Sequence, residues 1–320
     1  MELELAEVNS HGLIEALWDR HTVALYNQHG SFSHSSSSYQ AAYDSYYRRQ
    51  WDTLAGNGDG AHVAMGTPRE LDDYVRHLYK MTSMTRREIF DDLERKWGGG
   101  STEEALKNTL KLALSLLFML KFGLAAGQTE PSRGCLLWTE GSLEGCIREY
   151  FDQEPKLETR GVRLPRSFDA WSIQSIAGIE IHFTDNLIDH LKFIEDAESK
   201  KILVFHHVSF LECHQSSVFP GGFLDETLRT LAIIFPESEF GSYGCFKSCR
   251  TPWLRKLCNK DSACEVDSRL GSCETLRGAE RGIENFRFWR DRLVILKQEY
   301  DEATPRTLTQ FWNDRRNRVV

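Results

Sequence analysis

The sequence predicts a mainly α fold, a multi-helix single domain with a small β element around residues 179–206. Three observations support this prediction. Apolar residues recur at helical spacing in most segments that lie between turn signals. Two of these segments begin with a Thr that is followed three residues later by Glu, the capping box that starts a helix. Apolar and polar residues alternate, as in strands, at Ile179–Phe183.

The composition is that of a globular protein with a large core. The chain has 320 residues, of which 41% are hydrophobic, and its net charge is −8. A negative charge argues against a general nucleic-acid-binding protein. The eight cysteines follow no disulfide framework and no paired C-x2-C zinc pattern, and the N-terminus is acidic and polar. We therefore expect reduced thiols in a cytoplasmic protein.

The first part of the chain is predicted to be helical. An amphipathic helix covers about 12–27, and a Ser-rich linker follows at Ser31–Ser38. The sequence does not indicate where residues 1–66 pack in the fold. Residues 67–320 are expected to form the catalytic core of the single domain. Thr67 and Thr85 cap the first two helices of that core.

The helix after these, Glu103–Phe122, contains an uncharged run of nine residues between Lys111 and Lys121. About twenty apolar residues are needed to cross a bilayer, so we predict a buried core helix and no membrane segment. Gly123 is the expected end of this helix.

The second half of the chain contains the β element. Strands are expected at Ile179–Phe183 and Lys201–His206, joined by a helix over 184–196 that Thr184 or Asp185 caps. The other predicted helices are Leu143–Phe151, Phe223–Phe235 and a short one near Trp253–Leu257.

A long helix is predicted from Arg281 to near Pro305. Its apolar stripe consists of Ile283, Phe286, Leu293 and Tyr300, with Trp289 beside it and Arg290 and Lys297 on the stripe itself. A cation on a buried face needs a partner. That partner is either an acid on a facing helix or an anionic ligand such as a phosphate.

Asp185 and Asp189 are the first candidate metal ligands. On a helix, their carboxylates would lie on one face about one turn apart and could hold Mg²⁺, with Asn186 offering a neutral oxygen. The alternative is that Asp185 caps the helix and Asp189 is a surface charge.

Two other groups of polar residues are interpreted as structural. Asp72-Asp73 and Asp91-Asp92 lie near the starts of capped helices, where carboxylates are favoured, and we expect them at the surface. His206 and His207, with Glu212 and His214 after them, match no zinc spacing and are expected in the core or in turns.

Two stretches of the chain resemble a fungal protein family. They are Leu164–Glu212, which contains FTDNLIDHL and ILVFHHVSFLE, and Phe286–Leu308, which contains FRFWRDRLVILKQEYDEATPRTL. Some members of that family are similar to the humulene synthases of tropolone sesquiterpenoid pathways. Those terpene cyclases lack the usual aspartate-rich metal motifs, and this sequence lacks D-D-x-x-D as well.

The resemblance implies a sesquiterpene cyclase that converts farnesyl diphosphate to a humulene-type hydrocarbon with the help of Mg²⁺. In that family, an essential Lys holds the diphosphate, and a hydrophobic residue four positions earlier shapes the product. Lys297 and Leu293 match this spacing. Arg290 and Arg292 are expected to assist Lys297. Phe286, Trp289 and Tyr300 are expected near the substrate, because aromatic faces stabilise cations.

Two alternatives stay open at this stage. One is a non-catalytic helical protein, membrane-associated when full length, because relatives continue into membrane-spanning helices beyond the point where this sequence stops. The other is a prenyl transferase, which would need a second substrate. If Lys297 contacts a carboxylate, the non-catalytic alternative is favoured, whereas an open apolar pocket favours the cyclase.

Overall fold

A computed structural model describes most of the chain after residue 37. The described residues are 13–14, 17–18, 38–55, 63–124, 134–157, 161–197, 199–214, 217–240, 250–260 and 265–303. Most of the helix predicted at 12–27 and nearly all of the Ser-rich linker lie outside these ranges.

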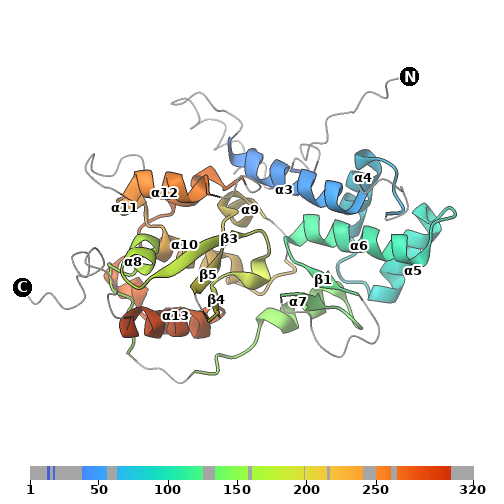
Figure 1. Cartoon of the computed structure of the whole chain (residues 1–320). Helices are drawn as coiled ribbons and strands as arrows, with labels where there is room; N and C mark the ends of the chain where they lie inside the picture. The colour runs from blue at the N-terminus through green and yellow to red at the C-terminus, as the bar shows by residue number, and fades with distance from the viewer. Residues whose placement is uncertain are drawn as a thin grey trace, which may run out of the picture. The chain divides into compact units, whose positions relative to one another are not determined.

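The described part of the chain is mainly helical and carries small β-sheets, as predicted (Figure 1). Its contacts divide it into two compact units. Unit 1 consists of residues 1–152, 185–188 and 213–220, and unit 2 of residues 153–184, 189–212 and 221–320. The chain therefore passes between the units several times, and a unit boundary follows Thr184, the last residue of a strand.

Unit 1 is built around the apolar helix α6 (Glu103–Phe118). It packs against three other helices, α3 (Ser38–Ala55), α4 (Pro68–Tyr79) and α5 (Arg86–Trp97). The unit also contains α7 (Leu143–Phe151) and the short parallel strands β1 (Phe122–Gly123) and β2 (Leu136–Leu137). The prediction that α6 is a buried core helix is confirmed, because ten of its residues are buried.

The predicted end of α6 at Gly123 is wrong. The helix ends at Phe118, and Met119 adopts a left-handed backbone conformation with φ 52°. Its N–H donates to the carbonyl of Ser115. Met119 is fully buried, so apolar packing holds a conformation that glycine would adopt more easily. Gly123 instead lies in β1.

Both predicted capping boxes are present. The hydroxyls of Thr67 and Thr85 accept from the N–H groups of Glu70 and Glu88, and each glutamate carboxylate accepts from the N–H of the capping Thr. Each cap satisfies helix N–H groups that lack an intrahelical partner.

Thr67→Ala is expected to lower the free energy of unfolding by about 1 kcal/mol, because the Glu70 N–H loses its acceptor. Chemical denaturation of Thr67→Ala and the wild type measures the difference. Thr53→Ala, an exposed change inside α3, serves as the control and should shift stability by less than about 0.5 kcal/mol. Equal losses in the two variants would contradict the capping role.

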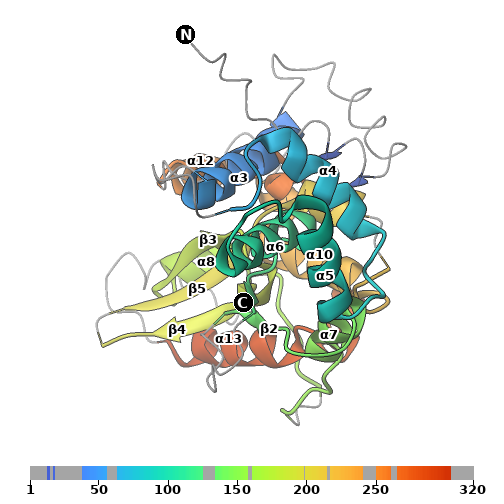
Figure 2. The same cartoon turned by 90° about the vertical axis from the view of Figure 1, so that its right-hand side faces the viewer.

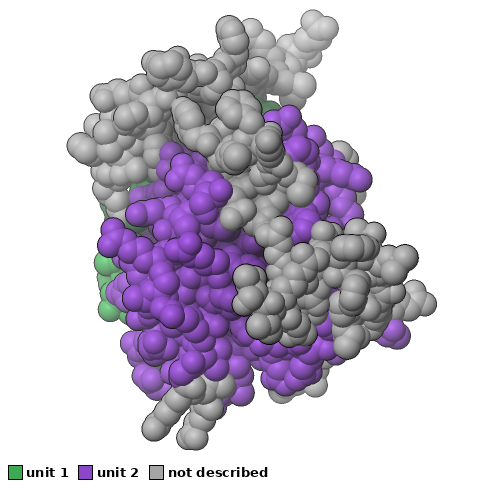
Figure 3. All heavy atoms as spheres, turned by 90° about the vertical axis from the view of Figure 1, so that its left-hand side faces the viewer, with its two compact units in different colours: residues 1–152, 185–188, 213–220 green, residues 153–184, 189–212, 221–320 purple. Residues whose placement is uncertain are grey.

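Unit 2 contains a three-stranded sheet in the order β3-β5-β4 (Figure 2). Strand β3 (Ile179–Thr184) is parallel to β5 (Lys200–Phe205), and β4 (Lys192–Glu195) is antiparallel to β5. Helix α13 (Arg290–Glu302) packs against β4, and α8 (Ala170–Ser175) against β3. The other described α-helices of this part of the chain are α9 (Val208–Cys213), α10 (Phe223–Ile234), α11 (Glu237–Phe240) and α12 (Arg250–Cys258). Figure 3 shows one face of this unit in purple.

The helix predicted over 184–196 is wrong. The structure has a single 3₁₀ turn at Leu187–Asp189, a bend at Leu191 with φ 58°, and then strand β4. The segment is short, so its pattern of apolar residues is compatible with a helix as well as with a strand. Pairing with β5 decides the outcome, since Phe193 lies opposite Ile202 in the antiparallel register.

The long helix predicted from Arg281 begins only at Arg290. Residues 278–285 form 3₁₀ turns, and Phe286 is extended. The buried carboxylate of Glu226 explains this start, because it accepts from the N–H groups of Arg287 and Trp289, each at 2.8 Å. These bonds from another helix hold the backbone in a non-helical path up to α13.

Candidate metal centre at the ends of two parallel strands

Three residues with metal-binding side chains follow the parallel strands β3 and β5. Thr184 and Phe205 are register partners and the last residues of their strands. Asp185 is bonded to Thr184, and His206 and His207 follow Phe205. Since parallel strands end at the same edge of a sheet, the register itself places Asp185 next to the two histidines.

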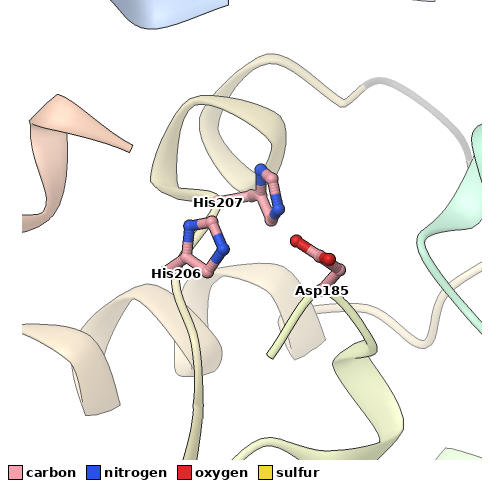
Figure 4. A group of neighbouring side chains, drawn as sticks. All are labelled: Asp185, His206 and His207. Atoms are coloured by element: carbon pink, nitrogen blue, oxygen red, sulfur yellow. The ribbon is translucent and has the colours of Figure 1, made fainter. Parts of the chain in front are cut away.

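Their ligand atoms converge. One carboxylate oxygen of Asp185 and one ring nitrogen each of His206 and His207 lie within 4.8 Å of one another. Figure 4 shows the carboxylate pointing toward the two rings. The rings of His206 and His207 are 4.0 Å apart at their centroids, and both residues are buried, whereas Asp185 is half-buried. We call these three residues the Asp-His-His group.

Second partners orient two members of the group. Arg49 of α3 donates to Oδ2 of Asp185 at 2.9 Å. The backbone N–H of Asp267 donates to Nδ1 of His206 at 3.3 Å. Burial raises the pKa of the Asp267 carboxyl, and hydrogen bonds and the nearby His206 act in the opposite direction. The contact to His206 comes from the backbone N–H of Asp267, so Nδ1 of this ring is an acceptor in the structure.

The chemistry of this ligand set does not fit Mg²⁺, the cation that the family resemblance implies. Mg²⁺ prefers oxygen ligands in a near-octahedral arrangement. Two imidazoles and one carboxylate instead suit divalent transition metals such as zinc, iron or nickel. The group therefore fits a nitrogen-preferring metal.

The three predicted Mg²⁺ ligands do not share one helix face. Asp185 belongs to the Asp-His-His group. The side chain of Asn186 accepts from the N–H of Lys121 and donates to the carbonyl of Gly134. Asp189 accepts from Lys192 at 2.8 Å. The geometric argument for this trio required a helix, so it fails, while a metal-binding role for Asp185 stays a prediction.

Both acidic pairs were predicted to lie at the surface. This prediction is wrong for Asp92, which is buried, and only partly right for Asp72, which is half-buried. Asp92 is buried, forms ion pairs with Arg95 and Lys96, and lies within hydrogen-bond distance of His77 at 2.7 Å. Asp72 is half-buried and accepts from Tyr47 at 2.8 Å. Asp73 and Asp91 are exposed, as predicted.

The basic residues of α13 have different surroundings. Lys297 forms an ion pair with Asp301, one turn further along the same helix, and only 14% of its side chain is exposed. Leu293, four residues earlier, is fully buried. Arg292 donates to the carbonyl of His190 and lies 5.2 Å from the ring of Trp289. Arg290 is partly exposed at the start of the helix.

The three predicted substrate-facing aromatics are buried and contact other parts of unit 2. Trp289 donates through Nε1 to the hydroxyl of Thr227, and Tyr300 packs edge-on against Phe168. The guanidinium of Arg229 lies over the ring of Phe286 at 4.8 Å. In this structure these rings contribute to the core, and a role beside a substrate stays a prediction.

Lys297 and the histidines lie toward opposite ends of β5. Lys200, at the start of β5, pairs with Glu299 near the end of α13. At the other end of the strand, the N–H of Phe205 donates to His190, whose carbonyl accepts from Arg292. The strand between these points is about 17 Å long. Lys297 is therefore on the Lys200 side and His206 on the far side.

The Asp-His-His group could be found in the sequence only in part. Asp185 was a candidate for another reason, and His206-His207 was assigned to the core because its spacing matches no zinc motif. A signal was available, since all three residues lie at, or within two residues of, the ends of predicted strands. Whether those strands are parallel neighbours was the missing information.

Comparisons with known proteins add no family. The chain matches no protein-family model, no curated protein and no solved structure. Among the described helices, none is both long and apolar enough to cross a membrane.

Proposed function

We propose that the chain is a sesquiterpene cyclase that converts farnesyl diphosphate to a humulene-type hydrocarbon and diphosphate. In this reaction the carbon–oxygen bond to the diphosphate breaks, the chain closes to a ring, and a proton is lost. The leaving group needs a fixed cation where its charge develops. Lys297 supplies this cation, and Leu293 lies one turn before it.

The observation that carries the proposal is the environment of Lys297. Its side chain is largely covered, and it lies on the same helix as the fully buried Leu293. The family resemblance implies this arrangement of a Lys with a hydrophobic residue four positions earlier. Asp301 is half exposed and serves as the resting partner of the ammonium, which a diphosphate would replace.

One observation favours a second candidate, a non-catalytic helical protein. Lys297 contacts a carboxylate, and an ion pair within one helix explains its position without any ligand. The two candidates differ in what Lys297 does. In a cyclase its ammonium holds the diphosphate, whereas in a non-catalytic protein it only pairs with the half-exposed Asp301, a contact of small energetic value.

Incubation of the purified protein with farnesyl diphosphate and Mg²⁺, followed by gas chromatography–mass spectrometry, tests the proposal. We expect a sesquiterpene from the wild type, which EDTA suppresses. Lys297→Ala should reduce its formation at least about 100-fold, because the charge on the leaving group loses its fixed partner. Asp301→Asn is the matched control and should retain product formation.

Three outcomes of this experiment would contradict parts of the proposal. If the folded wild type yields no product from farnesyl, geranyl or geranylgeranyl diphosphate, the non-catalytic candidate is favoured. If a product appears only when a second prenyl acceptor is added, the protein is a prenyl transferase. Equal activity of Lys297→Ala and the wild type would remove Lys297 from the reaction.

A further inference from the structure

We infer that Asp185, His206 and His207 form a binding site for a divalent transition metal ion that prefers nitrogen ligands, with Zn²⁺ as the simplest occupant. This inference does not depend on the cyclase proposal. It also departs from the Mg²⁺ that the family resemblance implies, because two of the three side chains are imidazoles.

The first argument is the origin of the three side chains. They come from the first positions after two paired parallel strands, so the backbone that carries them is held by the β3–β5 register. A metal site requires ligands held in place before the ion arrives, and the paired strands fix the backbone immediately before these ligands. The spacing of 4.8 Å or less between ligand atoms is compatible with one ion among them.

The second argument is burial. His206 and His207 have 0% and 1% exposure. The two ring centroids are 4.0 Å apart, so two imidazole nitrogens lie close together in the interior, shielded from bulk water. A cation bound there would contact one nitrogen of each ring. It would also attract the Asp185 carboxylate, which brings a negative charge into the group.

The third argument is the surrounding hydrogen-bond network. Asp185 can bind an ion through one oxygen while Oδ2 accepts from Arg49, the kind of second contact that ligating carboxylates have.

Metal titration of the protein as purified and then freed of metal with chelator tests this inference. By isothermal titration calorimetry we expect one Zn²⁺ per chain, with roughly micromolar affinity or tighter. Millimolar Mg²⁺ should not compete. Co²⁺ should give the visible absorption bands of a nitrogen-ligated ion, a readout that needs no variant and no substrate.

Variants connect binding to the three residues. His207→Gln, His206→Gln and Asp185→Asn should each weaken Zn²⁺ binding about 100-fold or more. His182→Gln changes a half-exposed histidine of β3 outside the group and should bind as the wild type does. Circular dichroism shows which variants are folded.

Three results would overturn the inference. They are no Zn²⁺ binding by the folded wild type, binding that survives His207→Gln together with Asp185→Asn, and displacement of Zn²⁺ by equimolar Mg²⁺. Because no farnesyl diphosphate is used, an inactive protein that binds Zn²⁺ would contradict the cyclase proposal alone.

Discussion

Glu226→Ala will lower the free energy of unfolding by about 3–5 kcal/mol, because it leaves the buried N–H of Trp289 and the partly buried N–H of Arg287 without an acceptor. The Glu226 carboxylate is 6% exposed and accepts from the N–H groups of Arg287 and Trp289, each at 2.8 Å. Burial raises the pKa of this carboxyl, and these backbone bonds act in the opposite direction. The carboxylate thus provides the hydrogen-bond acceptors for these two N–H groups, which lie before the first residue of α13.

Urea denaturation of three variants measures this effect. Glu226→Gln keeps one acceptor oxygen and should lose clearly less stability than Glu226→Ala. Asp225→Ala, an exposed change in the preceding position of α10, should be within about 0.5 kcal/mol of the wild type. A loss below about 1 kcal/mol for Glu226→Ala would show that water or another group satisfies the N–H groups.

The second large effect is a change in acid sensitivity when His214 is replaced. His214 is buried against the rings of Phe118 and Phe219 in unit 1, and burial lowers its pKa to about 3. In the unfolded chain the pKa is about 6.5. The unfolded state therefore binds the proton first as the pH falls. The contribution of neutral His214 to stability is complete above pH 6.5 and is lost progressively from there toward pH 3.

His214→Phe removes this titration. Between pH 6.5 and pH 3, its free energy of unfolding should fall less steeply than that of the wild type, by up to about 1.4 kcal/mol per pH unit. Thermal or urea unfolding at four pH values measures the two slopes. His214→Gln also removes the titration and should share the shallower slope despite a different absolute stability. Parallel slopes for all three proteins would contradict a neutral His214 in the folded state.

Local signals in the sequence predicted the parts of the fold that depend on neighbouring residues. The capping boxes at Thr67 and Thr85 were correct because Thr and Glu three residues apart satisfy each other's backbone. Strands β3 and β5 were recognised by their alternation and apolar content. The apolar run of α6 was correctly assigned to the core.

The errors occur where a distant residue decides the local structure. The start of α13 depends on Glu226, which is some sixty positions away and gives no sign in the sequence around Arg287. The segment after Asp185 becomes strand β4 because β5 offers it a partner. Met119 takes a left-handed conformation that its residue type does not favour.

In the candidate site as well, the part that depends on distant residues could not be predicted. Asp185 was selected as a metal ligand from its spacing to Asp189, but in the structure its neighbours among the metal-binding side chains are His206 and His207. Their proximity follows from the parallel pairing of β3 with β5, which joins residues about twenty positions apart. Without the sheet topology, the histidine pair could only be assigned to the core.

A crystal of the protein grown with Zn²⁺ tests the central claim, the Asp-His-His group as a metal centre, most directly. Diffraction data collected on both sides of the zinc absorption edge locate the ion without reference to its expected place. We predict one strong anomalous peak, about 2 Å from a nitrogen of each histidine and from an oxygen of Asp185. A peak at other residues, or none at this group, would contradict the account.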